Sequence, residues 1–166
     1  MRDDDSLDLL DANRAYADAF DAHDASKIPA RRLFVLTCMD ARVDPLRLLG
    51  LQVGDANIVR NAGGRVTDDV VRSLVLSTTL MGTDRVAVIH HTDCGLGSTT
   101  DERIRADVAE HGVDIGELWT GAFGDLDDSV RADVADLQRL AGVRDRVLVH
   151  GYVYDVATGR LRAVDD

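Results

Sequence analysis

Along the chain, apolar runs of strand length alternate with segments whose apolar residues recur at helical spacing, which predicts alternating strands and helices. Apolar runs of strand length predict four strands, at residues 33–37, 56–61, 85–90 and 146–154. Helical periodicity and capping residues predict helices between them, at residues 44–50, 67–81, 100–110 and 127–140. Residues 160–164 follow a Thr-Gly turn, and we expect them to form a fifth, antiparallel edge strand. This order is typical of an α/β fold with a mostly parallel central sheet and helices on both faces.

The first 30 residues follow a different pattern from the rest of the chain. Residues 6–24 predict an acidic amphipathic helix, and a short linker follows at residues 27–30. We therefore expect an N-terminal helical arm and linker at residues 1–30 and a single α/β domain at residues 31–166. A chain of 166 residues is long enough for one such domain.

Charge and composition exclude several classes of partner. The formal net charge is −11, and an acidic surface repels phosphate backbones, so we expect no binding to nucleic acid. No apolar stretch approaches the roughly 20 residues of a membrane span, and no apolar signal core follows the first methionine. Two cysteines in such a chain indicate the cytoplasm, where thiols serve metal binding or catalysis more often than disulfides.

The two cysteines occupy equivalent places, each just after a predicted buried strand. Cys38 follows the first apolar run, and Cys94 follows the third, with His91 three residues before it. Two thiolates and one imidazole are good zinc ligands, and three protein ligands leave a fourth position open, as catalytic zinc sites do. Ligands gather at the carboxyl ends of parallel strands. If the two strands are neighbours, the sequence predicts one zinc ion per chain at this edge.

Each of these residues also has an ordinary interpretation. A single free cysteine is more often a small buried apolar residue than a ligand, and only the matched positions of Cys38 and Cys94 favour a metal. His90 competes with His91 as a ligand. Because side chains alternate between the faces of a strand, we expect only one of the two to face the metal. His91 fits the three-residue spacing to Cys94, and we expect His90 to be packed or to hold a neighbouring group.

Charged residues and glycines surround the predicted centre. Asp40 and Arg42 are either an ordinary solvated ion pair or a functional pair, in which Asp40 binds zinc or its water and Arg42 holds the carboxylate away from the metal. For Asp93, between the two later ligands, we expect a role in the turn or in holding a neighbouring group. Gly63 and Gly64 follow the second strand and either form a simple turn or let backbone N–H groups approach the substrate.

These segments together resemble the β-class carbonic anhydrases. Residues 38–43 (CMDARV), 60–63 (RNAG) and 91–95 (HTDCG) resemble three motifs of that family in the same order, and the likeness covers most of the chain. Residues 155–159 (DVATG) are similar to a segment of the short bacterial branch.

The resemblance implies a lyase that interconverts carbon dioxide and bicarbonate by zinc-bound hydroxide. It implies Cys38, His91 and Cys94 as ligands and Asp40 with Arg42 as the catalytic dyad. It further implies a homodimer, often paired into a homotetramer, with the N-terminal helix reaching over a partner subunit. Because two thiolates cancel the charge of Zn²⁺, we expect activity to favour alkaline pH.

Two alternatives remain open from the sequence. The loop at residues 95–126 is short, and Gly64 stands where many relatives have asparagine, so a hydrolase of carbonyl sulfide or carbon disulfide on the same zinc site is the first alternative. The second is a non-catalytic zinc protein in which Asp40 closes the site as the fourth ligand.

Overall fold

The computed structural model describes residues 9–140, 142–143 and 145–164 of the chain. Its centre is a five-stranded sheet in the order β2-β1-β3-β4-β5. The strands are β1 (Leu33–Cys38), β2 (Ala56–Asn61), β3 (Arg85–His91), β4 (Leu148–Tyr154) and β5 (Leu161–Val164). β2, β1, β3 and β4 are parallel to one another, and β5 is antiparallel to β4. This confirms the predicted α/β class and the antiparallel edge.

Three strand boundaries differ from the prediction in ways that matter locally. β1 and β3 each continue one residue further than predicted, so that Cys38 and His91 are the last residues of their strands. β4 begins at Leu148 rather than at residue 146. The backbone N–H groups of Arg146 and Val147 both donate to the carbonyl of Val143, so these residues form a turn and are not available for the sheet.

Side-chain caps begin the helices at or next to the predicted residues. The helices after β1 are α2 (Pro45–Leu49), α3 (Asp68–Leu80), α4 (Asp101–Glu110) and α5 (Leu126–Arg139). The side chains of Asp44, Thr67, Thr100 and Asp125 accept hydrogen bonds from backbone N–H groups in the first turns, which satisfies donors that the helix itself cannot pair.

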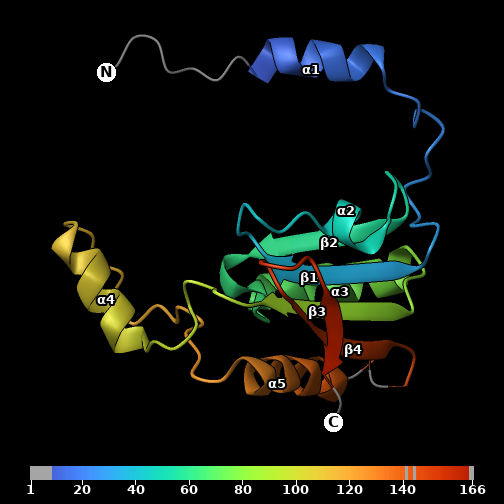
Figure 1. Cartoon of the computed structure of the whole chain (residues 1–166). Helices are drawn as coiled ribbons and strands as arrows, with labels where there is room; N and C mark the ends of the chain where they lie inside the picture. Colours follow the sequence, from blue (N-terminus) through green and yellow to red (C-terminus); the bar gives the residue numbers. More distant parts are fainter. Residues whose placement is uncertain (1–8, 141, 144, 165–166) are drawn as a thin grey trace.

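The two faces of the sheet are covered to different degrees (Figure 1). On one face α3 and α5 bury a large core against β1, β3 and β4, which includes Phe34, Leu36, Leu74, Val88 and Leu137. On the other face the one helix that packs on the sheet, within the described part of the chain, is the short helix α2, through Leu48 and Leu49. This second face keeps an apolar depression, lined by residues such as Leu33, Leu51, Tyr152 and Leu161.

The N-terminal helix α1 (Leu9–Asp18) stands away from the sheet (Figure 1). It buries none of its residues. Of the predicted helix at residues 6–24, residues 6–8 lie outside the described part of the chain, and the described helix ends at Asp18. Tight turns at Ala19 and Phe20 close it, because the following residues lack an apolar stripe that could pack and extend it.

Across the described residues, no helix is both long and apolar enough to span a membrane.

An ion pair between α5 and β5 gives a first prediction, on stability. Arg162 donates to Asp127 at 3.0 Å and holds the pKa of that carboxyl below its usual range. Asp127 therefore stabilises the fold above the unfolded pKa, about 3.9, and this contribution is lost as the pH falls through the folded pKa. Asp127→Asn should lower the free energy of unfolding at pH 7 by less than about 1 kcal/mol.

Urea unfolding of variants with equal metal content tests this assignment. The difference in the free energy of unfolding between wild type and Asp127→Asn should shrink below about pH 4. It should nearly vanish at pH 7 when both proteins also carry Arg162→Gln. A difference that is independent of both pH and Arg162 would contradict the ion pair as its source.

Candidate metal centre

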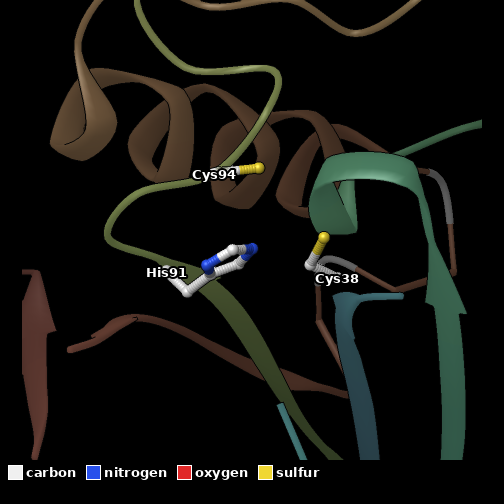
Figure 2. Close-up of side chains that lie close together, drawn as sticks. All are labelled: Cys38, His91 and Cys94. Carbon is white, nitrogen blue, oxygen red and sulfur yellow. The ribbon is translucent and has the colours of Figure 1, made fainter. Parts of the chain in front are cut away.

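The structure brings Cys38, His91 and Cys94 together at the carboxyl edge of the sheet. β1 ends at Cys38, the neighbouring strand β3 ends at His91, and Cys94 lies in the turn that follows. Their ligand atoms all lie within 4.8 Å of one another. Figure 2 shows the three side chains pointing into one common space. The first and third strands are neighbours, which is the condition on which the predicted convergence of the three ligands depended.

The imidazole of His91 is oriented as a metal ligand would be. Its Nδ1 lies 2.8 Å from the carbonyl oxygen of Thr92, which fixes the proton on that nitrogen. The other nitrogen, Nε2, is buried and has no hydrogen-bond partner among the described residues. A buried polar atom is costly without a partner, and a bond from the second ring nitrogen to a carbonyl is the usual arrangement of a metal-bound histidine. His91 therefore fits a metal ion.

The two thiols shift each other's pKa in opposite directions. The hydrogen bond from Cys94 lowers the pKa of Cys38 to about 4 against the effect of burial, with help from His91 and from the backbone N–H groups of Asp40 and Gly63. The hydrogen bond with Cys38 in turn raises the pKa of Cys94. A cation between the sulfurs would allow both to be thiolates, the form that binds metals.

Asp40 is held beside the ligands by Arg42. The Arg42 guanidinium donates to both carboxylate oxygens, from Nε at 3.0 Å and from Nη2 at 2.8 Å, and its backbone N–H donates at 2.8 Å. These bonds hold the pKa of Asp40 well below its usual range, so the carboxylate is ionised. Its Oδ2 lies 3.9 Å from Nε2 of His91. The pair is thus adjacent to the ligands, with the carboxylate bound to arginine.

Arg42 also joins the two loops that carry the ligands. It donates to the Asp93 carboxylate at 2.7 Å and to the Asp93 carbonyl at 2.9 Å. Asp93 has a φ of 55°, in the left-handed region, so it makes the turn between His91 and Cys94 as well. Both roles expected for Asp93 are therefore present in one residue.

The glycines after β2 lie against Cys38. Gly64 has a φ of 69°, and a Cβ there would lie 2.9 Å from the backbone nitrogen of Cys38 and 2.9 Å from the carbonyl carbon of Thr37. Asparagine at this position would push the strand end that carries the ligand, so the departure from asparagine has a steric reason. A contact of Gly63 and Gly64 with substrate stays a prediction.

Two groups of residues escaped the sequence analysis. Arg60 donates from Nε to the carbonyl of Cys38 at 3.1 Å and from Nη2 to that of Asp40 at 2.8 Å, so it braces the loop between them. His90 packs away from the centre, as predicted, but its partners Ser129 and Asp133 were missed. The signal for Asp133 was available, because it is a carboxylate on the apolar stripe of α5, next to Val130, Val134 and Leu137 in helical spacing.

Fold and site together define an α/β protein with a Cys-His-Cys cluster suited to a metal ion at the carboxyl edge of its sheet. The carbonic anhydrase family model matches residues 33–118. β-carbonic anhydrase 1 of Mycobacterium tuberculosis is 37% identical over 137 residues, which cover 82% of this chain and 83% of that protein. The chain belongs to the β-carbonic anhydrase family.

Other relatives show how far the likeness extends. The crystal structure of carbonic anhydrase from Streptococcus mutans superimposes with a TM-score of 0.89 at 41% identity, covering 94% of this chain and 95% of that one. Carbon disulfide hydrolase of Saccharolobus solfataricus is 36% identical over 156 residues, which cover 80% of this chain and 76% of that protein. The framework therefore occurs in proteins named for two different reactions.

The geometry of the cluster predicts zinc binding that depends on Cys94. Wild-type protein equilibrated with zinc and dialysed should contain about one ion per chain, and Cys94→Ser should lose most of it, because a neutral hydroxyl replaces a thiolate ligand. Elemental analysis of the dialysed proteins measures this. His150→Gln, at a histidine of β4 outside the cluster, is the matched control and should keep its zinc. Full zinc content in Cys94→Ser would contradict the ligand set.

Proposed function

We propose that this chain is a zinc-dependent carbonic anhydrase that reversibly hydrates carbon dioxide to bicarbonate and a proton. The observation that carries the proposal is the Asp40–Arg42 pair beside a cluster of three candidate ligands. Cys38, His91 and Cys94 would hold the zinc ion. Zinc at such a site lowers the pKa of a water molecule at its open position. The family membership and the β-carbonic anhydrase relatives support the same reaction.

In this proposal Asp40 orients the nucleophile. An ionised carboxylate accepts hydrogen bonds and donates none, so Asp40 would accept a hydrogen bond from the attacking hydroxide and turn its lone pair toward the carbon of carbon dioxide. Arg42 fixes the carboxylate by two parallel bonds, an arrangement that gives both strength and direction. The loop backbone at Gly63 and Gly64 is proposed to approach the developing bicarbonate oxygens.

The same geometry ranks the alternatives. Asp40 as a permanent fourth ligand requires the carboxylate to leave Arg42, and three donor groups of Arg42 now hold it. That favours an open fourth position, and hence an enzyme, over a closed zinc protein. Hydrolysis of carbonyl sulfide or carbon disulfide needs the same residues, and the carbon disulfide hydrolase relatives support this as the second candidate.

We also propose that the protein acts as a cytoplasmic homodimer or homotetramer in which residues 1–30 form an arm. Leu9, Leu10, Tyr16 and Phe20 of this segment are exposed. Apolar side chains on an isolated helix need a partner surface. The apolar depression on the open face of the sheet, at Leu33 and Leu161, offers such a surface on a second copy.

Parallel assays on the zinc-loaded protein test the reaction. Stopped-flow measurement of carbon dioxide hydration and detection of sulfide released from carbonyl sulfide and carbon disulfide use one preparation. We expect carbon dioxide hydration to have the highest kcat/KM, because the fold and site match the β-carbonic anhydrases. Sulfide release with no measurable hydration would replace the first candidate by the second. No turnover of any of the three would favour the non-catalytic protein.

The proposed role of Asp40 and Arg42 predicts a loss of turnover without loss of metal. Asp40→Ala and Arg42→Ala should each reduce kcat by about two orders of magnitude. The double variant should lose less than the sum of the two free-energy changes, because both residues serve one role. Asp69→Ala and Arg72→Ala, from an exposed pair on α3, are matched controls and should stay near wild type. Near-normal hydration by Asp40→Ala at neutral and alkaline pH would indicate that Asp40 and Arg42 are an ordinary surface ion pair without a catalytic role.

A further inference from the structure

Arg65 is a buried cation with unusually many partners. It lies directly after the short 3₁₀ turn η1 (Ala62–Gly64), and its residue is only 8% exposed. Its guanidinium donates to Asp133 from Nε at 2.7 Å and from Nη2 at 3.3 Å. Nη1 donates to the carbonyl of Gly121 at 2.7 Å. The guanidinium carbon Cζ lies 5.2 Å from the ring centroid of Trp119 and 5.8 Å from that of Phe123.

A buried ion pair is weak evidence for stability, because desolvation offsets much of the attraction. Such a pair does fix the geometry of whatever it connects, since removal of one partner leaves a buried charge unpaired. The segments that Arg65 connects are therefore informative, and each of them adjoins one of the three candidate ligands.

The first connection leads to His91. Oδ2 of Asp133, which binds Arg65, lies 3.1 Å from Nε2 of His90, and Nδ1 of His90 lies 2.8 Å from the hydroxyl of Ser129. His90 is thus held at both ring nitrogens on the α5 side of the sheet. Because His91 is the next residue of the same strand, a fixed His90 also fixes the backbone from which His91 projects in the opposite direction.

The second connection leads to Cys94. The Gly121 carbonyl bound to Arg65 is two residues before Phe123, whose N–H donates to the carbonyl of Leu96 at 3.0 Å. The Phe123 carbonyl accepts from the N–H of Ser98 at 2.8 Å, so residues 96–98 and Phe123 form a small ladder. That ladder holds the loop that begins at Cys94.

The third connection leads to Cys38. The side chain of Asn61 accepts from the Arg65 N–H at 2.9 Å and donates to the Arg65 carbonyl at 2.8 Å, which closes the η1 turn. Gly64 within that turn lies against the backbone of Thr37 and Cys38. The position of Arg65 is therefore tied to the strand end that carries Cys38.

We propose that Arg65 is a positioning residue that sets the relative placement of Cys38, His91 and Cys94 and so tunes the affinity and geometry of the metal centre. The inference deepens the proposed function and rests on its metal site. Arg65 touches neither the ligands nor a substrate in this arrangement, and it acts through Asp133, Gly121 and Asn61. Changes to such outer partners typically cost about 10- to 100-fold in metal affinity or activity.

The test uses two substitutions and one matched control. Arg65→Met removes the charge and keeps a long side chain, whereas Arg65→Lys keeps the charge but cannot bind Asp133 and the Gly121 carbonyl as a planar fork. Arg162→Met breaks the more exposed Arg162–Asp127 pair, which joins the same helix α5 to β5. Each protein is titrated with Zn²⁺ against a chromogenic chelator, and each is loaded with Co²⁺ for absorption spectroscopy.

The expected result is a change in the metal centre at preserved fold. Arg65→Met should bind Zn²⁺ about 10- to 100-fold more weakly, and the ligand-field bands of its Co²⁺ form should shift. Arg65→Lys should fall between Arg65→Met and wild type, and Arg162→Met should match wild type in both measurements. A merely structural arginine would lower the thermal midpoint and leave the zinc affinity and Co²⁺ spectrum of the folded protein unchanged. That outcome would overturn the proposal.

The test also distinguishes a variant that fails to fold and a wild type that lacks the proposed activity. If Arg65→Met does not fold, Arg65→Lys carries the test, and a wild-type zinc affinity and Co²⁺ spectrum for it would overturn the proposal. If the wild type binds Co²⁺ but hydrates no carbon dioxide, the proposed reaction fails, while a shifted spectrum in the Arg65 variants still supports the positioning role. Activity in the wild type with unshifted variant spectra would refute the positioning role alone.

Discussion

The parallel pairing of β1 with β3 determines where every side chain of the candidate metal centre lies. The register places Leu33 opposite Arg85 and Thr37 opposite Ile89, so β3 ends at His91, one residue beyond the level of Cys38. The buried hydroxyl of Thr37 donates to the carbonyl of Ile89 at 2.9 Å and reinforces the pairing just below the cluster. A slip by one residue would exchange the faces of all side chains in a strand. It would turn His91 into the α5 core and bring His90 to the metal site.

The centre concentrates negative charge in a chain that is already acidic. Cys38, Cys94, Asp40 and Asp93 all lie at one edge, and two arginines from different segments offset them. Arg42 binds the side chains of Asp40 and Asp93, while Arg60 binds backbone carbonyls of the Cys38 loop. Arg42 holds the carboxylates and Arg60 holds backbone oxygens, so neither arginine engages the sulfurs or Nε2 of His91. This division of partners separates the candidate metal ligands from the group proposed to orient the nucleophile.

The sequence predicts best what depends on near neighbours along the chain. The helix caps at Thr67 and Thr100 depend on residues within one turn. The choice of His91 over His90 depends on strand alternation and on the three-residue spacing from His91 to Cys94. Arg65 and Asp133 are 68 residues apart, and no local pattern connects them. The early end of α1 escaped the sequence analysis for a related reason, since helix length depends on packing partners that one chain's periodicity does not show.

The contact of Gly64 with the backbone of Thr37 and Cys38 limits how this framework can diversify. A Cβ at that position would lie 2.9 Å from the backbone nitrogen of Cys38, so a larger residue there requires the strand end beside Cys38 to shift. The segment between α4 and α5 holds glycines of both kinds: a Cβ at Gly121 would lie 2.9 Å from Cγ of Arg65, whereas a Cβ at Gly124 would meet no atom within 4 Å. At Gly124 a substitution therefore adds side-chain atoms without displacing the strand end that carries Cys38. Gly64 and Gly124 thus mark two extremes of mutational tolerance within one fold.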